Sequence, residues 1–273
     1  MDLTAPVPSE TAPETAPVVA LHRSEDGVAT VTLNRPQRLN ALNRPMWPAL
    51  TEHFNTLSAD SSVRCVVVTG AGKAFSPGAD ISEFATERPN SAAAAAYGAV
   101  MDTTYRAIEG CPHPIIAAIR GPCTGAGLVL ALKCDLRIAS RTAKFGAAVA
   151  RLGLAMPYPE FKALFQAVGR TVAMEMVLEA TVLDADAALA KGLISRIVPD
   201  ETFEAAIAET IGRVTAGAPL VHRWHKEFAR RLSDPQPLTD AEIAASYASF
   251  STADYQEGFQ AFLGKRKPMF RGT

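Results

Sequence analysis

The glycine-rich stretch GPCTGAGLV, residues 121–129, is typical of a turn that presents backbone amides to a ligand. It joins a strand-like apolar run, PIIAAIR, to a helix-like apolar run, GLVLALKC. Gly121, Gly125 and Gly127 carry no side chains where the chain turns, and the free N–H groups at a helix start form a partial positive charge. Because the turn contains no Lys, no Arg and no GxxxxGK[ST] motif, it favours a developing oxyanion over a triphosphate.

A second turn of the same kind lies earlier, in VRCVVVTGAGKAFSPGADIS, residues 63–82. The β-branched run CVVVT is typical of a buried parallel strand, and the glycine-punctuated loop GAGKAFSPGAD precedes another helix start. The chain therefore has two strand–loop–helix units, and each offers backbone amides.

Together these segments resemble the enoyl-CoA hydratase/isomerase (crotonase) superfamily. The resemblance rests on GAGKAFSPGADI and RGPCTGAG, followed by LALKCDLRIAS, AKFG and GLISRIVP, and it runs from about Val18 to Phe270. It implies that a CoA thioester is the substrate or ligand and that no cofactor is permanently bound. It also implies that two backbone N–H groups, those of Ala79 and Ala126, stabilise the oxyanion formed from the thioester carbonyl.

The resemblance further implies where CoA is held. Pro77, Ala79 and Ile81 correspond to the loop at the adenine end of CoA, and Lys265 and Lys267 fall in a region that can meet its phosphates. A basic run near a chain end is also commonly just solvated, so the sequence leaves that alternative open for the two lysines.

The two glutamates that activate water in hydratases of this family are missing. Their positions correspond to Val129 and Val149, which can neither accept nor donate a proton. Because each general acid or base contributes about 10²–10⁴-fold to a rate, losing both argues against the usual two-glutamate hydration mechanism. Some hydrolases and dehalogenases of the superfamily place an Asp eight residues further on, where this chain has Pro157.

Candidate replacement acids lie in the segment LAMPYPEFK, which supplies Tyr158 and Glu160 just before a helix. The structural alternative is that an acid in the first turn of a helix complements the helix dipole and does nothing else. No metal site is predicted, because His222 and His225 have neither a third ligand nor an HExxH pattern.

Two functional hypotheses remain open. One is an enzyme of the lyase or isomerase type that acts on an acyl-CoA of fatty acid metabolism through unfamiliar acid–base groups. The other is a catalytically silent acyl-CoA-binding protein, which the valines favour if no substitute acid faces the pocket. A scaffolding role would explain neither glycine loop.

Composition narrows the class of partner. The net charge is −1 with acidic and basic residues interspersed, which gives no electrostatic case for nucleic acid or a membrane surface. The four cysteines show no CxxC pairing, which fits a reduced, cytoplasmic protein. No apolar run reaches the roughly 18 residues that a membrane-spanning helix requires. Residues 1–17 lack the features of a signal peptide, and their Pro, Ala, Thr and Glu content predicts a disordered tail.

The remaining pattern predicts an α/β protein. VVALHR and VATVTLN are expected to pair as antiparallel strands, and strands continue at intervals through residues 18–200. Residues 201–273 are nearly all helical in pattern, with apolar stripes in excess of what one core needs. The resemblance implies a crotonase-like spiral of ββα repeats whose C-terminal helices form homotrimers, with hexamers built from pairs of trimers.

Overall fold

Residues 16–273 are described by the computed structural model, so the tail expected at residues 1–17 lies almost wholly outside the described residues. The main sheet has six strands in the order β1-β2-β3-β4-β6-β9, and only the β1–β2 pair, which the sequence predicted, is antiparallel. These strands are β1 (Val19–Arg23), β2 (Val28–Leu33), β3 (Cys65–Gly70), β4 (Ile115–Ile119), β6 (Leu136–Ser140) and β9 (Arg196–Val198).

A second sheet has three short strands, one of which lies within the glycine-rich stretch at residues 121–129. Its members are β5 (Pro122–Thr124), β7 (Lys144–Gly146) and β8 (Val182–Asp184). β5 leads directly into α4 (Gly125–Leu132), so the smaller sheet anchors the start of that helix.

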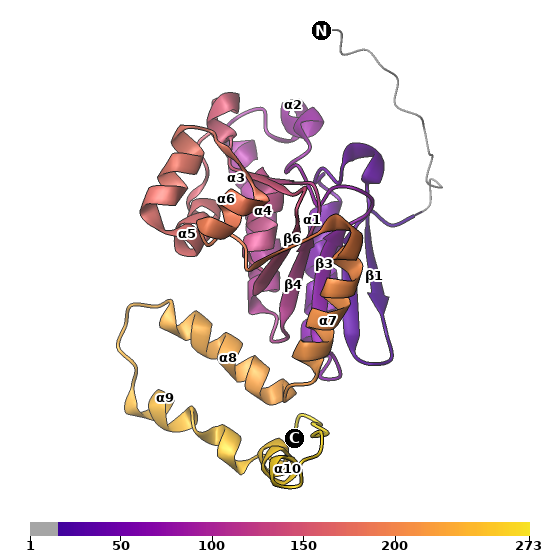
Figure 1. The fold of residues 1–273 in the computed structure, drawn as a ribbon. Helices are drawn as coiled ribbons and strands as arrows, with labels where there is room; N and C mark the ends of the chain where they lie inside the picture. Colours follow the sequence, from indigo (N-terminus) through magenta and orange to yellow (C-terminus); the bar gives the residue numbers. More distant parts are fainter. Residues whose placement is uncertain (1–15) are drawn as a thin grey trace.

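One face of the main sheet is covered by α1, α3 and α4, because the alternate residues that point to that face share one apolar cluster with these helices (Figure 1). The helices between β2 and β9 are α1 (Met46–Ala59), α2 (Phe84–Glu87), α3 (Ser91–Gly110), α4, α5 (Tyr158–Leu178) and α6 (Ala185–Ala190). Short 3-10 helices occur at η1 (Pro36–Arg38), η2 (Ile81–Glu83) and η3 (Val149–Leu152). Gly169, with φ at 74°, divides α5 into two helical parts.

The other face of the sheet is covered by α7 (Phe203–Thr215), whose Phe203 and Ile207 pack against residues of β2, β3, β4 and β6. The helical part expected from residue 201 therefore begins with a helix of the core. The last helices, α8 (Pro219–Leu232), α9 (Asp240–Ala245) and α10 (Ala253–Leu263), extend below the sheet in Figure 1. Two further 3-10 helices, η4 (Asp200–Thr202) and η5 (Ala248–Ser251), join this region.

All four cysteines are free and buried. Within residues 16–273, no helix is both long and apolar enough to span a bilayer, and no group of three or more potential metal ligands is found.

Candidate active site

The first loop of the site runs from the end of β3 to Asp80, and one buried side chain holds it in place through hydrogen bonds. Asn40 is fully buried, and its side-chain amide donates hydrogen bonds to the carbonyl oxygens of Ala71 (2.9 Å) and Ala74 (2.7 Å). The Ser76 hydroxyl donates to the Asn40 carbonyl at 2.8 Å. These bonds fix a loop that has no regular structure of its own.

The second loop meets the first directly. The Ser76 amide donates to the Pro122 carbonyl at 2.8 Å, and the Thr124 amide donates back to the Ser76 carbonyl at 3.0 Å. Gly78 is required at the crossing, because a Cβ there would lie 2.9 Å from the Thr124 carbonyl oxygen and 3.3 Å from the Ala126 nitrogen. The segment GAD and the start of α4 are therefore packed backbone against backbone.

The amides of Ala79 and Ala126 both lie at this crossing without a protein acceptor among residues 16–273. On either side of Ala79, Leu42 donates to the Gly78 carbonyl at 2.8 Å and accepts from the Asp80 amide at 2.9 Å. Ala126 is the second residue of α4, whose N-cap Thr124 makes no side-chain capping bond. Neither amide has a protein acceptor among the hydrogen bonds of the described residues. A carbonyl oxygen placed between them would satisfy both.

Asp80, the acid of the GAD segment, is held in a structural role. Its carboxylate pairs with Arg35 at 2.9 Å and accepts bonds from the amide and hydroxyl of Ser82. The Ser82 hydroxyl is the first cause that lowers the pKa of Asp80, and Arg35 lowers it further. A carboxylate engaged in this way is a poor proton donor at neutral pH.

Val129 and Val149, which the family resemblance matches to the two glutamates of hydratases, differ in burial. Val129 is fully buried one turn into α4, and Val149 is half-buried at the start of η3. Val129 belongs to the main apolar cluster, and neither valine side chain can exchange a proton.

Glu160 lies in the first turn of α5 and is half-buried. Burial raises the pKa of its carboxyl from 4.5 to about 7, and the charge of Arg88 partly offsets that effect. A carboxyl with this pKa exists in both protonation states near neutral pH, which is what general acid–base catalysis requires.

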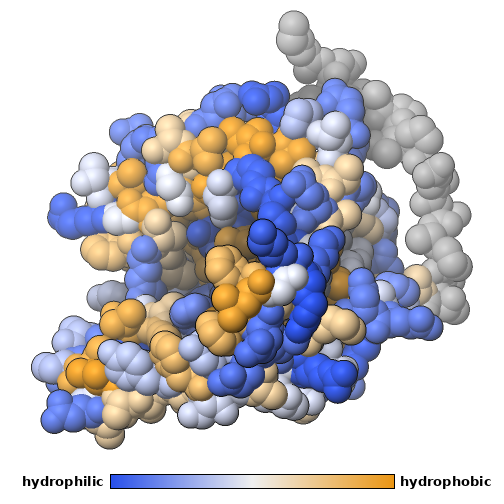
Figure 2. Space-filling view, turned by 60° about the horizontal axis from the view of Figure 1, so that its bottom comes forward, coloured by the Kyte–Doolittle hydropathy of each residue, from blue (hydrophilic) through white to orange (hydrophobic). Residues whose placement is uncertain are grey.

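Tyr158 lies two residues before Glu160 and points elsewhere. Positions two apart on a helix do not share a face, and the Tyr158 side chain is 91% exposed. It lines an outer cleft of about 1060 Å³ between α3, α5 and α8, together with charged residues such as Lys162 and Lys226. Figure 2 shows the underside of the molecule, which is hollowed between the core and the C-terminal helices. Only Glu160 of the two candidate replacements is placed toward the interior.

The residues expected to bind CoA fall into two separate groups. Pro77 and Ile81 are exposed beside Ala79. Lys265 and Lys267 are exposed just after α10, at the opposite end of the molecule from α2 (Figure 1). Within one chain, the structure does not bring the two lysines to the Ala79 loop.

Two residues near Glu160 were not singled out by sequence reasoning. Tyr105 on α3 is 2% exposed, and its hydroxyl has no hydrogen-bond partner. Burial is the first cause that raises its pKa, and the charge of Glu160 is the second. Arg88 precedes α3 and affects the pKa of both groups. Their spacing in the chain gave no signal, because residues 88, 105 and 160 meet only in the folded protein.

Comparison with known proteins bears on this geometry. The family model for enoyl-CoA hydratase/isomerase matches residues 23–273. The chain belongs to the enoyl-CoA hydratase/isomerase family. The crotonase-like α/β fold with a helical C-terminal region is thereby confirmed.

Relatives with names and structures are similar over nearly the whole chain. The 1,2-epoxyphenylacetyl-CoA isomerase of Escherichia coli is 35% identical over 259 residues, covering 92% of this chain and 98% of the relative. The short-chain-enoyl-CoA hydratase of Clostridium acetobutylicum is 33% identical over 246 residues, covering 89% and 94%. The crystal structure of an enoyl-CoA hydratase/carnithine racemase from Magnetospirillum magneticum has a TM-score of 0.93 at 48% identity and covers 95% of this chain and 97% of that one.

Proposed function

We propose that this protein acts on an acyl-CoA thioester, whose carbonyl oxygen binds between the amides of Ala79 and Ala126. The observation that carries the proposal is that both N–H groups lack acceptors at a place where two loops cross backbone against backbone. Donors fixed in advance stabilise negative charge on an oxygen as it develops and need no rearrangement during the reaction.

The reaction class follows from what such a pair of donors can do. They stabilise an enolate or a related oxyanion, which is the charge formed when a proton moves next to a thioester carbonyl. Relatives named a hydratase and an isomerase of CoA thioesters fit the same class. We therefore assign lyase or isomerase chemistry on an acyl-CoA, of the kind used in fatty acid metabolism.

Glu160 is the proposed acid–base group. Val129 and Val149 exclude the usual pair, Asp80 is held by Arg35 and Ser82, and Tyr158 is exposed on an outer surface. Glu160 alone of these candidates combines partial burial with a pKa near neutral. The proposed proton-transfer group therefore lies on α5 and not on α4 or η3.

The test is a panel of saturated, enoyl and branched acyl-CoAs, with affinity and product measured together for the unmodified protein and for Glu160→Gln. The proposal expects at least one thioester to bind and be converted, and the variant to bind it equally well without converting it. Turnover that survives in Glu160→Gln would overturn the acid–base assignment. Absence of binding by every thioester would overturn the assignment of the amide pair.

A catalytically silent acyl-CoA-binding protein is the second candidate. The two buried or half-buried valines favour it, because apolar side chains shape an acyl pocket without transferring protons. Binding without conversion across the whole panel would select this candidate over the enzyme.

Assembly and CoA binding are proposed together. Pro77 and Ile81 lie beside the amide pair and are suited to the adenine end of CoA. Lys265 and Lys267 reach the CoA phosphates only if they come from another copy, because they follow α10, which lies at the opposite end of the molecule from α2 (Figure 1).

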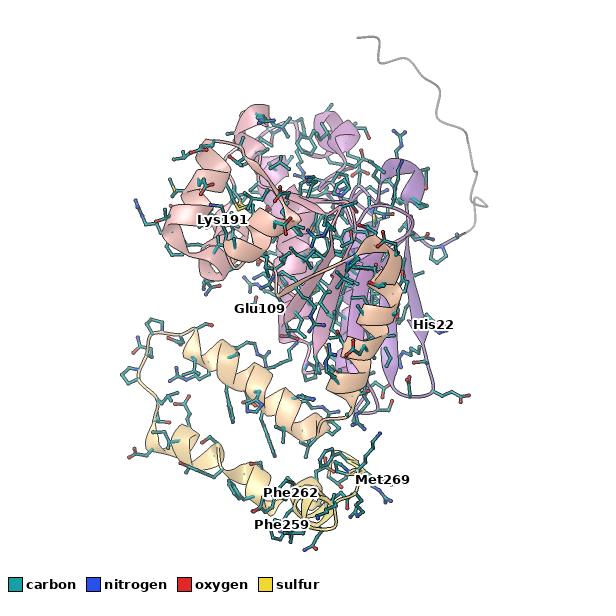
Figure 3. The ribbon with its side chains drawn as sticks, in the orientation of Figure 1. His22, Glu109, Lys191, Phe259, Phe262 and Met269 are labelled. Atoms are coloured by element: carbon teal, nitrogen blue, oxygen red, sulfur yellow. The ribbon has the colours of Figure 1, made fainter. Side chains whose placement is uncertain are left out.

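The C-terminal helices carry exposed aromatic and aliphatic side chains suited to such an interface between copies. Figure 3 shows Phe259, Phe262 and Met269 at this end, and Phe262 is 82% exposed. Burying this apolar surface between copies would build a homotrimer or a hexamer. Light scattering at micromolar concentration is expected to give one of these masses, and a monomer mass would contradict the proposed assembly.

A further inference from the structure

Tyr105 presents a buried hydroxyl that the protein itself leaves unsatisfied. The side chain is 2% exposed, and its oxygen has no hydrogen-bond partner among residues 16–273. Such a hydroxyl is unusual in a folded protein, because burying it without a partner is unfavourable. The hydroxyl is therefore a donor for which a ligand is the expected acceptor.

A second tyrosine on the same helix differs from Tyr105 in this respect. Tyr97 lies two turns earlier on α3, is equally buried, and accepts a hydrogen bond from the Trp47 indole at 3.0 Å. The Trp47 ring also packs edge-on against the Tyr105 ring, with centroids 5.6 Å apart. The Tyr105 ring is thus fixed by packing while its hydroxyl stays free.

Arg88 is a second donor, and the protein forms few hydrogen bonds with its guanidinium group. Its guanidinium stacks over the Tyr97 ring at 3.9 Å and the Phe84 ring at 4.7 Å. Its guanidinium donates a hydrogen bond to the Met101 sulfur at 3.6 Å, and a thioether sulfur is a weak acceptor. Among residues 16–273, no carboxylate lies within salt-bridge distance of Arg88. Stacking fixes the cation and leaves N–H groups for another acceptor.

These donors lie near the segments that carry the proposed acid–base group and the amide pair. Arg88 contacts Met101, which lies one helical turn before Tyr105 on α3, and the charge of Glu160 adds to the raised pKa of the Tyr105 hydroxyl. Arg88 ends the short segment, η2 and α2, that continues directly from the Ala79 loop. α5, which carries Glu160, packs on α4, which carries Ala126. The region is thus positioned to receive the acyl part of a thioester held at the two amides.

We propose that the acyl group bound here carries a hydrogen-bonding oxygen beyond the thioester carbonyl, and that Tyr105 donates a hydrogen bond to it, with Arg88 as the second donor. The proposal rests on the proposed function and specifies its substrate class. An unsubstituted alkyl chain would leave the Tyr105 hydroxyl unsatisfied in the complex. An oxygenated chain satisfies it, so the site discriminates between the two.

The experiment compares affinities for butyryl-CoA, 3-hydroxybutyryl-CoA and 4-hydroxybutyryl-CoA by calorimetry. These ligands share the thioester and chain length and differ in the added oxygen. The unmodified protein is expected to bind at least one hydroxylated thioester roughly 3- to 10-fold more tightly than butyryl-CoA, the effect of one neutral hydrogen bond. Tyr105→Phe removes only the hydroxyl and is expected to abolish that preference without changing the affinity for butyryl-CoA.

Tyr97→Phe is the matched control, because it removes a hydroxyl that already has a partner on the same helix. It is expected to keep the preference for the hydroxylated thioester. Equal affinity of the unmodified protein for all three ligands, or a preference that survives in Tyr105→Phe, would overturn the inference while leaving acyl-CoA binding intact. Failure of all three ligands to bind would instead overturn the proposed function, and with it this inference.

Discussion

The crossing at Ala79 and Ala126 is built from backbone groups, whereas the acid–base region around Glu160 is built from side chains. Backbone donors depend on loop geometry, which Gly78 and the buried Asn40 maintain. They do not depend on which side chain follows, so alanine at position 126 leaves the donor in place.

Side-chain chemistry is removed by a single substitution, and Val129 and Val149 stand where the family resemblance places the two glutamates of hydratases. The difference teaches that the two halves of one site can change independently. Under the proposed function, the two loops hold the thioester carbonyl, while the proton-transfer group comes from another helix. We propose that this helix is α5, whose Glu160 has its pKa raised to about 7 by burial.

The largest expected effect is on ordinary hydration. With crotonyl-CoA the unmodified protein is expected to show negligible loss of enoyl-thioester absorbance, because each missing acid or base is worth about 10²–10⁴-fold. The Val129→Glu/Val149→Glu variant tests whether the backbone half is intact. Measurable hydration by this variant would show a working amide pair. Rapid hydration by the unmodified protein would contradict the statement that its usual acid–base side chains are missing while its backbone donors are intact.

Glu160→Gln is the next largest test and addresses the side-chain half alone. For the thioester that the protein converts best, kcat is expected to fall by about 10²–10⁴-fold with little change in affinity. Glu179→Gln, at the exposed C-cap of the same helix, is the matched control. The pH profile of kcat/KM in the unmodified protein should change near pH 7, and an unchanged profile in Glu160→Gln would contradict the assignment.

The raised pKa also predicts how stability depends on pH. The folded protein holds the Glu160 proton more tightly than the unfolded chain, so this contribution is complete below pH 4.5 and is lost as the pH rises to about 7. Relative to Glu160→Gln, the free energy of unfolding should therefore decrease by up to about 3 kcal/mol between these pH values. Urea unfolding of both proteins at pH 5 and pH 8 measures this decrease. An equal change in the free energy of unfolding in the two proteins would contradict the raised pKa of Glu160.

Much of the backbone half could be predicted from the sequence, because it depends on local patterns. Glycines between a β-branched run and an apolar helix indicated both loops, and the family resemblance assigned Ala79 and Ala126 within them. The antiparallel pair of β1 and β2 also followed from short-range alternation. Patterns of this kind involve residues close together in the chain.

The side-chain half was only partly predictable, because it depends on contacts between distant segments. Tyr158 and Glu160 looked equivalent in sequence, yet their separation on α5 leaves one exposed and one half-buried. Tyr105 and Arg88 gave no sequence signal at all. The helical pattern after residue 200 likewise did not reveal that α7 packs on the sheet, since an amphipathic stripe does not identify its partner.

Calorimetry of butyryl-CoA binding to Ala79→Pro tests the central claim most directly, because proline removes the amide hydrogen. Ala79→Gly, which keeps that hydrogen, is the control. If the carbonyl oxygen binds between the two amides, affinity should fall by about 3- to 10-fold in Ala79→Pro and stay near the unmodified value in Ala79→Gly. Unchanged affinity in an Ala79→Pro protein whose circular dichroism shows it to be folded would contradict the account.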